Sequence, residues 1–402
     1  MLQNVAQKYI WRLILVFLLG LIAACGDTDN TATPAEPTPV AWRVSTAAIN
    51  QTTAPRIALV GRLDGHGSTV FQMSFSSDSR YLATVSAGDQ RVNIWDTTSG
   101  ENIGGVGTLE PIWAFFDPSA EYFYIIDRKR TISQWSMQNG NQVATLPVQR
   151  ETDLIGSITF GNGGNWVATS GERGMVYIVS LNPFEPIAEI NAHPVVPVTS
   201  IALSDSGKYL VSLGADNVVR IWDIATNDML LELKDFNNPK QVLFSPNDEQ
   251  LAIFTETVIY LYDTADWSRQ ASMIVPNGAV GSEAQYSNDG SKLITYGDDL
   301  SVYIWNLETQ ALWVELPNHR RGVKRALLSQ DQSMMITLSG AEDVFLWDLT
   351  PVTGVNSREV ELRRANLPLP NNINVHDLWW SPDERFLAVA DFVGRVFIFG
   401  IP

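Results

Sequence analysis

The chain has 402 residues, 27 of them basic and 44 acidic, and its formal net charge is −17 at pH 7. So acidic a balance argues against nucleic acid as a partner. The single cysteine excludes a disulfide within the chain and a cysteine–zinc site.

The N-terminal 24 residues have the features of an export signal. Lys8 and Arg12 give a cationic start, and residues 13–24, LILVFLLGLIAA, form an apolar run too short to span a bilayer comfortably. The run ends in IAAC with Cys25, and this order resembles the bacterial lipoprotein signal. The resemblance implies a signal peptide over 1–24, a lipidated Cys25, and an extracytoplasmic protein of the bacterial cell envelope that is held at a membrane by its lipid. An uncleaved anchor with a chance cysteine is the alternative.

The next segment predicts a linker. Residues 26–53 are rich in Thr, Pro, Ala and Asp, and such a segment buries too little apolar surface to fold by itself. We therefore expect residues 25–54 to form a lipidated tether that holds a globular body away from a membrane. Trp42 is expected to be a stray exposed aromatic, and docking on the body is the alternative.

From residue 55 to residue 402 one pattern recurs. An apolar strand ends in a turn such as SSDS or SPND, and a second apolar strand follows. After a short polar turn comes a third strand, seen most clearly as VNIWD (92–96), VRIWD (219–223), VYIWN (302–306) and VFLWD (344–348). The closing positions are Trp95, Trp135, Val179, Trp222, Tyr262, Trp305, Trp347 and Phe399. Their separations are 40, 44, 43, 40, 43, 42 and 52 residues, which is the spacing of propeller blades.

This pattern resembles the WD-repeat β-propeller family over essentially all of residues 55–402. The resemblance implies an all-β fold, a single propeller of four-stranded antiparallel blades. Eight closing strands predict eight blades, and seven is the alternative if the degenerate second or third copy is left out. Because the chain ends just after the last closing strand, we expect residues 56–63, RIALVGRL, to supply the missing outer strand and close the ring.

The resemblance also implies buried hydrogen-bonded sets in the blades that keep a histidine before the first strand. In the family such a histidine bonds to an aspartate, a serine or threonine, and the tryptophan. The candidates are, in the first unit, His66, Thr84 or Ser86, Asp89 and Trp95; in the fourth, His193, Ser212, Asp216 and Trp222; and in the sixth, which lacks the histidine, Thr295, Asp299 and Trp305. We expect these sets to be structural, and the other five units to keep fragments at most.

Candidates for chemistry are few. His66, His193 and His319 fall in different repeats, so they are not expected to share a metal ion. His376 stands beside Asp377, but no nucleophile or partner carboxylate can be tied to the pair. The acidic turns lack the alternating oxygen ligands of a calcium loop. We therefore predict no catalytic residue, no cofactor and no metal.

Two basic loops contrast with the acidic background. NHRRGVKR (318–325) leads into the first strand of the seventh unit, and DRKR (127–130) precedes the third strand of the second. The resemblance places both on the face that the family uses most often for partners, although exposed loops can simply be charged. The candidate binding residues for an acidic partner are Arg320, Arg321, Lys324 and Arg325, with Arg128, Lys129 and Arg130.

Two classes of function follow from the sequence. The preferred one is a non-enzymatic, membrane-tethered, extracytoplasmic scaffold, a monomeric domain that binds a protein partner through one face of the propeller. The alternative is a periplasmic or surface enzyme, or a small-ligand binder, that uses the central channel. The scaffold is preferred because the residues at the start of the inner strands show no repeated carboxylate or histidine pattern.

Overall fold

The computed structural model describes residues 42–402 apart from residues 44, 46, 87, 108–109, 129–130, 148–154, 172, 277–282, 342 and 353–363. The predicted signal peptide, Cys25 and the first part of the predicted tether lie outside the described residues. Among the described residues, no helix is both long and apolar enough to cross a membrane.

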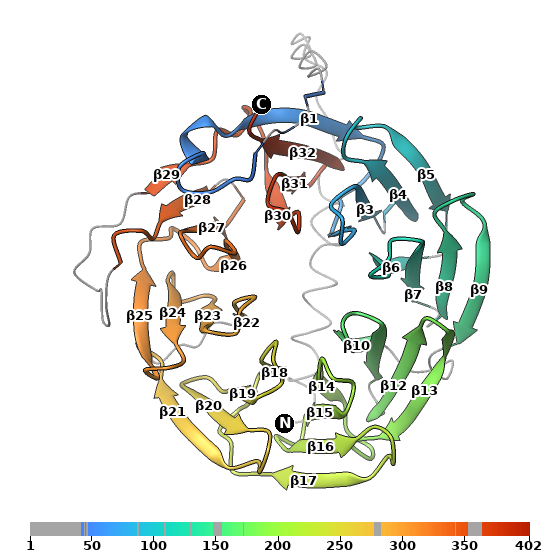
Figure 1. Ribbon diagram of the computed structural model, residues 1–402, viewed down its shortest axis with the longest axis vertical. Coiled ribbons are helices and arrows are strands. Elements are labelled where there is room, and N and C mark those ends of the chain that lie inside the picture. The colour runs from blue at the N-terminus through green and yellow to red at the C-terminus, as the bar shows by residue number, and fades with distance from the viewer. Residues whose placement is uncertain are drawn as a thin grey trace, which may run out of the picture. The chain divides into compact units, whose positions relative to one another are not determined.

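The described strands form eight four-stranded antiparallel sheets arranged as blades around a ring (Figure 1). Blades 1 to 4 comprise β2 (Gln72–Phe75), β3 (Tyr81–Ser86), β4 (Arg91–Asp96) and β5 (Asn102–Gly107); β6 (Pro111–Phe116), β7 (Tyr122–Asp127), β8 (Thr131–Ser136) and β9 (Gln142–Pro147); β10 (Ile155–Gly161), β11 (Trp166–Gly171), β12 (Met175–Leu181) and β13 (Phe184–Asn191); and β14 (Val198–Leu203), β15 (Tyr209–Gly214), β16 (Val219–Asp223) and β17 (Met229–Leu233).

Blades 5 to 8 repeat the arrangement. They comprise β18 (Gln241–Phe244), β19 (Gln250–Phe254), β20 (Val258–Asp263) and β21 (Arg269–Ile274); β22 (Glu283–Tyr286), β23 (Lys292–Tyr296), β24 (Val302–Asn306) and β25 (Ala311–Leu316); β26 (Val323–Leu328), β27 (Met334–Ser339), β28 (Asp343–Asp348) and β29 (Arg364–Asn366); and β30 (Val375–Trp380), β31 (Leu387–Asp391), β32 (Arg395–Gly400) and β1 (Ala58–Asp64). The prediction of eight blades is confirmed, and the seven-bladed alternative is wrong.

The core lies between neighbouring blades. The second strand of each blade is buried on both faces, and every residue of β27 is buried. Such strands carry continuous apolar runs because each blade is covered by a neighbour on either side. One cluster, for example, joins Ile294 and Ile304 of blade 6 to Met335 and Trp347 of blade 7. No blade could bury its faces alone, which is why the sequence repeats.

The turns between first and second strands of blades 1, 5, 6, 7 and 8 share one hydrogen-bonding pattern. In blade 6 the Ser287 hydroxyl donates to Asp289 Oδ1 at 2.6 Å and accepts the amide of Lys292 at 2.9 Å. Burial alone would raise the pKa of Asp289, but hydrogen bonds from Ser287, Ser291 and Gln332 hold it at about 2. These bonds explain why serine, aspartate and asparagine recur in the turns.

The ring closes as the sequence predicts. β1 pairs antiparallel with β32, from Ala58 opposite Gly400 to Asp64 opposite Arg395. An early segment thus supplies the outer strand of blade 8, beside the last three strands of the chain (Figure 1).

The part of the expected tether that precedes β1 is packed on the propeller, and we call residues 42–53 the strap. Ala47 forms a bridge with Ile401, the Ile49 amide donates to Glu384 O at 2.7 Å, and Ile49 is fully buried. A Cβ at Gly61 or Gly100 would fall about 2 Å from the Trp42 ring, so the indole lies directly on both glycines. Trp42 is therefore not a stray exposed aromatic, and the folded body begins before residue 55.

Candidate functional site

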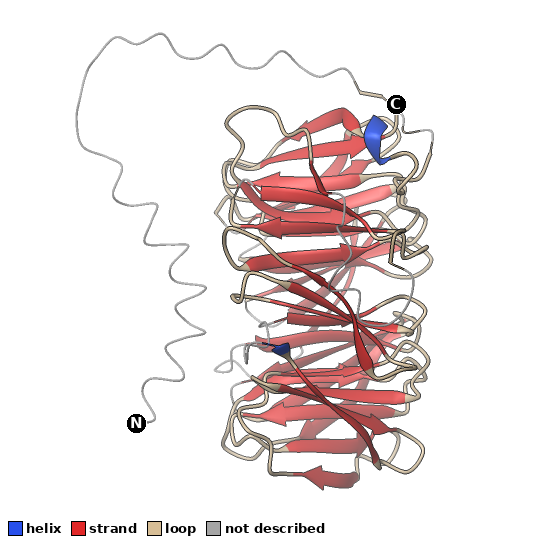
Figure 2. Ribbon diagram, turned by 90° about the vertical axis from the view of Figure 1, so that its left-hand side faces the viewer, coloured by secondary structure: helices blue, strands red, loops and turns tan. Residues whose placement is uncertain are grey.

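The strand order gives the ring two different edges, seen side-on in Figure 2. The turns that join first to second and third to fourth strands lie on one edge, which we call the turn rim. The connections from second to third strands and from one blade to the next lie on the other, which we call the loop face. The strap contacts the turn rim, because Trp42 lies on Gly100 of the β4–β5 turn and Ile49 bonds to Glu384 of the β30–β31 turn.

In blade 1, the buried side chain of His66 holds the loops of the loop face in place through hydrogen bonds. Trp95 Nε1 donates to Thr84 Oγ1 at 2.9 Å, His66 Nε2 lies 2.8 Å from the same oxygen, and His66 Nδ1 lies 3.0 Å from Asp89 Oδ2. Because a carboxylate only accepts, Nδ1 carries the proton, and Nε2 accepts from the threonine hydroxyl. The structure selects Thr84 over Ser86, whose hydroxyl donates to Ser68 O at 3.2 Å.

Blade 4 has the same arrangement with a cation added. Trp222 Nε1 donates to Ser212 Oγ at 3.1 Å, His193 Nε2 lies 3.0 Å from that oxygen, and His193 Nδ1 lies 3.2 Å from Asp216 Oδ1. Arg220 contacts both His193 Nδ1 and Asp216. Burial lowers the pKa of His193, and the Arg220 charge acts in the same direction against the attraction of Asp216.

Blade 7 contains a third set that the sequence analysis did not assign. Trp347 Nε1 and His319 Nε2 each lie 2.9 Å from Thr337 Oγ1, and His319 Nδ1 donates to the Leu300 carbonyl of blade 6 at 3.1 Å. A carbonyl thus replaces the aspartate. The separation of 18 residues from His319 to Thr337 matches that from His66 to Thr84, so the spacing alone could have revealed this set.

Blades 2, 3 and 6 show what remains when a member is missing. In blade 6, Trp305 Nε1 donates to Thr295 Oγ1 at 3.1 Å, while burial raises the pKa of Asp299 and hydrogen bonding with Tyr303 opposes the rise. In blade 2 the Trp135 indole donates to Ser133 in its own strand at 2.9 Å. In blade 3, where Val179 stands in place of the tryptophan, the buried Thr169 hydroxyl has no hydrogen-bond partner among the residues that the structure describes.

The main basic loop divides into two parts. Arg320, Arg321 and Lys324 are exposed on the loop face, and the side chain of Arg320 is 82 % exposed. Arg325, at the first strand of blade 7, instead holds Asp377 of blade 8 in a two-pronged ion pair of 2.9 and 2.5 Å and lies 4.8 Å from the Trp379 ring centroid. Its binding capacity is used between blades, so the predicted four-cation patch is reduced to three cations.

The second basic loop contributes little to this surface among the described residues. The Arg128 amide donates to Glu110 O at 3.0 Å, and its guanidinium lies 3.9 Å from the Glu110 carboxylate. Lys129 and Arg130, the other candidates in this loop, lie outside the described residues.

His376 lies beneath the loop of blade 8. Its ring contacts the Phe392 ring edge-on, with 4.9 Å between centroids, and burial lowers its pKa. Asp377, the expected acid–base partner, is occupied by Arg325. Over the described part of the chain, no group of three or more histidine, cysteine or acidic side chains is placed to hold a metal ion.

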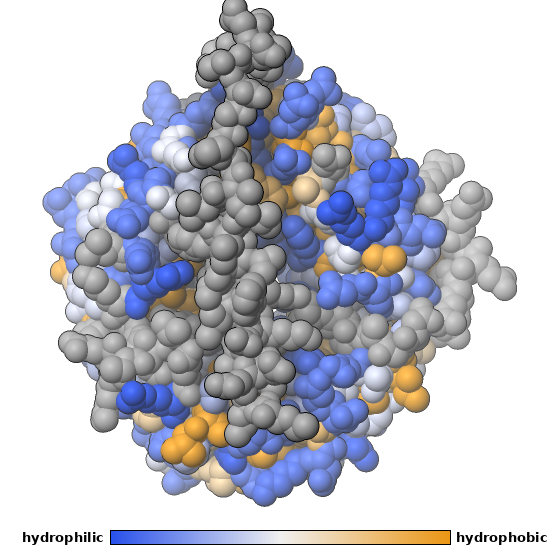
Figure 3. Space-filling model, turned by 180° about the vertical axis from the view of Figure 1, so that it is seen from behind, coloured by the Kyte–Doolittle hydropathy of each residue, from blue (hydrophilic) through white to orange (hydrophobic). Residues whose placement is uncertain are grey.

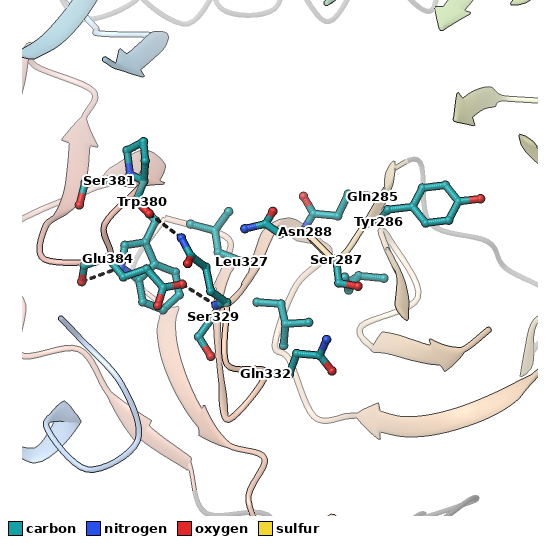
Figure 4. A pocket seen from close by; sticks show the side chains of 14 residues that line it. Gln285, Tyr286, Ser287, Asn288, Leu327, Ser329, Gln332, Trp380, Ser381 and Glu384 are labelled. Carbon is teal, nitrogen blue, oxygen red and sulfur yellow. Dashed lines mark hydrogen bonds between the residues drawn. The ribbon is translucent and has the colours of Figure 1, made fainter. Parts of the chain in front are cut away.

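A small cavity of about 200 Å³ lies on the turn rim between blades 6, 7 and 8 (Figure 4). Gln330 donates through Nε2 to Pro382 O and through its amide to Glu384 Oε1, both at 2.6 Å, and Trp380 Nε1 donates to Glu384 O at 3.2 Å. Gln330 of blade 7 thus bonds to the turn of blade 8. The polar groups around the cavity therefore serve mainly to hold the two blades together.

Comparison with known proteins agrees with this geometry. The family model described as "WD domain, G-beta repeat" matches residues 57–96 and 184–223. These segments run through the third strands of blades 1 and 4, and with them come the two sets that contain histidine, aspartate, hydroxyl and indole. The chain thus contains two segments that match the WD40 repeat, and its fold is an eight-bladed β-propeller.

Relatives of this propeller are distant. It is 24% identical over 316 residues to a WD repeat-containing protein 26 homolog of Arabidopsis thaliana, covering 74% of this chain and 51% of that protein. It is 26% identical over 189 residues to a p21-activated protein kinase-interacting protein 1-like protein of Danio rerio, covering 46% and 50%. The chain thus spans about half the length of these two relatives.

A solved structure shows the same fold. The C-terminal WD40 domain of Sif2 superposes with a TM-score of 0.69 at 13% identity, covering 86% of this chain and 98% of that one. At this identity the likeness shows the fold alone, and a shared fold does not by itself assign a function.

Proposed function

We propose that this propeller is a lipid-tethered scaffold outside the cytoplasmic membrane that binds a protein partner through its loop face. The observation that carries the binding site is the exposure of Arg320, Arg321 and Lys324 in a chain of net charge −17. A local cationic surface on an acidic protein attracts an acidic partner while the rest of the surface repels it.

The buried histidine sets support this use of the loop face. His319 ties the start of the basic loop to Thr337 and to Leu300 of blade 6. The Arg321 amide donates to Ser339 Oγ at 3.2 Å, and that hydroxyl donates to Arg321 O at 2.7 Å. The loop backbone is therefore fixed before a partner arrives, which lowers the entropy cost of binding.

A capture experiment tests the scaffold. Residues 26–402, without the lipid, serve as bait in cross-linked envelope extract beside the variant Arg320→Glu/Arg321→Glu/Lys324→Glu. We expect the wild type to retain a specific protein that the variant loses. The matched control is Arg80→Glu/Lys208→Glu/Arg269→Glu, three exposed cations on the turn rim, which changes net charge equally. Equal capture by all three baits would refute the assigned face, and no capture would refute the scaffold.

The tether requires its own test. Cys25→Ser removes the proposed lipidation site, so the protein should move from the membrane fraction to the soluble fraction and lose the mass of the acyl groups. If the wild type is itself soluble, or carries no lipid by mass spectrometry, the membrane part of the proposal fails and the scaffold part still stands.

A further inference from the structure

Apolar side chains flank Arg320, Arg321 and Lys324, the three exposed cations of blade 7 on the loop face. Leu300, in the β23–β24 loop of blade 6, is 42% exposed. Phe392 and Val393, in the β31–β32 loop of blade 8, are 38% and 62% exposed. Large apolar residues thus stand on two loops of one face, on either side of the basic loop of blade 7, and form a patch with it rather than a scatter.

Direct contacts join these apolar residues to the basic loop. The amide and Nδ1 of His319 bond to the Leu300 carbonyl at 3.2 and 3.1 Å, so the blade 6 loop is fixed to the start of the basic loop. At its other end, Lys324 Nζ lies 5.7 Å from the Phe392 ring centroid. The surface is therefore continuous from blade 6 to blade 8.

The apolar part on blade 8 is held in place from below. The His376 ring supports Phe392 edge-on, and Thr69 of blade 1 donates to Phe392 O at 2.6 Å. The Val393 amide donates to Asp391 Oδ1 at 3.0 Å. The side chains of Phe392 and Val393 are thus presented on a turn whose backbone is fixed by hydrogen bonds. Such preorganisation is expected of a site that buries an apolar anchor residue.

The cations beside this patch have few partners of their own. Among the described residues, Arg320 forms a long ion pair of 3.9 Å with Asp343. The carboxylate of Asp377, in the neighbouring blade 8, is paired with Arg325. Carboxylates of a partner would therefore meet cations that are largely unneutralised.

We propose that Arg320, Arg321, Lys324, Leu300, Phe392 and Val393 form one two-part site for an acidic segment of a partner protein that carries a large apolar side chain. This inference rests on the proposed scaffold function and names the chemistry of its partner. The cations bind the carboxylates and steer the approach, while the apolar residues bury the anchor. On the face seen in Figure 3, apolar and strongly hydrophilic surface lie side by side.

Peptide selection tests the proposal without knowledge of the partner. A phage-displayed library of random twelve-residue peptides is selected on residues 26–402. We expect enrichment of peptides that combine Asp or Glu with Phe, Leu, Ile or Trp. A labelled enriched peptide should bind about tenfold or more weakly to Phe392→Ser and to Arg320→Glu/Lys324→Glu, and equally to the turn-rim variant Arg80→Glu/Lys208→Glu/Arg269→Glu. Thermal melts establish that each variant is folded.

Other outcomes overturn the proposal in distinct ways. Enriched peptides that are acidic but lack an apolar residue, and that bind Phe392→Ser as well as the wild type, would show a purely anionic site. Peptides insensitive to both loop-face variants would place binding elsewhere. If the library yields no binder while the capture experiment retains a partner, the two-part site fails and the scaffold stands; if both fail, so does the scaffold.

Discussion

The hydroxyl in the second strand of a blade is where the indole and the imidazole meet. In blade 7, Thr337 Oγ1 serves both Trp347 and His319. Thr337→Val leaves these two buried groups unpaired and should lower the free energy of unfolding by about 1–3 kcal/mol, measured by urea denaturation.

Thr169 of blade 3 is a matched control, because its hydroxyl is buried and has no hydrogen-bond partner in the described part of the chain. Thr169→Val should be neutral or stabilising, since it removes an unsatisfied polar group. Equal losses in the two variants would show that the hydroxyl bonds of blade 7 contribute nothing beyond side-chain shape.

The buried histidines make stability depend on pH. Burial lowers the pKa of His319 to about 4 from the ordinary 6.5, so between these values the unfolded chain binds a proton that the folded chain does not. Stability is therefore full above pH 6.5 and falls as the pH drops toward 4, by up to about 1.4 kcal/mol per pH unit for each such histidine. The urea midpoint should decrease from pH 7.5 to pH 5, and His319→Gln should make that slope shallower. An unchanged slope would contradict the assignment.

At the scale of single residues, the sequence predicted the histidine sets in which an aspartate accepts the hydrogen bond. It missed the set in which another acceptor takes the place of the aspartate. His66 and His193 could be matched to an aspartate by position. His319 could not, because its acceptor is the Leu300 carbonyl, which carries no side-chain signature. The basic loop was likewise taken as one patch, because the partner of Arg325 is 52 residues away in the next blade.

First strands are joined blade to blade by side chains that reach across the boundary. Gln72 of blade 1 donates to Ala114 O at 3.0 Å and accepts the Ala114 amide at 3.1 Å. Gln241 of blade 5 makes the same pair of bonds to Ala284. Between blades 7 and 8 the ion pair of Arg325 and Asp377 connects the first strands instead of a glutamine. This contact between blades is therefore charged rather than neutral.

The charged joint predicts an asymmetry between single and double variants. Arg325→Met leaves the largely buried Asp377 unpaired and should cost about 2–4 kcal/mol, whereas Arg325→Met/Asp377→Leu should cost less because no charge is stranded. Arg320→Met, on the exposed part of the same loop, should change stability by no more than about 0.5 kcal/mol. Urea denaturation of the three variants measures these costs. A double variant less stable than Arg325→Met would show that the ion pair itself is stabilising.

The sequence predicted the elements well wherever they repeat. Eight closing strands were found because each keeps its apolar run even when the tryptophan is replaced, as by Val179 and Phe399. The strap was missed because its Thr- and Ala-rich composition is that of a linker. Its burial depends on pairing with Ile401, a contact over 356 residues that local composition does not encode.

For the whole molecule, the strap should set the stability of the closed ring. Residues 40–402 should melt like residues 26–402, whereas residues 55–402, the domain expected from sequence, lose the buried Ser45 and Ile49 and the bridge to Ile401. The melting temperature should fall by about 5 °C or more, measured by thermal denaturation. Identical melting of all three would mean that the strap is bound without supporting the fold.

Ring closure also imposes an order on the making of the protein. Blades 1 to 7 pair strands that follow one another in the chain, so each can form soon after it is synthesised. β1 and the strap must wait for β32 and Ile401, more than 300 residues later. Throughout that interval the nascent chain carries an apolar strand without its partner, and pairing of this kind is slow and prone to misassociation. The growing chain, more than the finished ring, is therefore the form of this protein that most needs a chaperone.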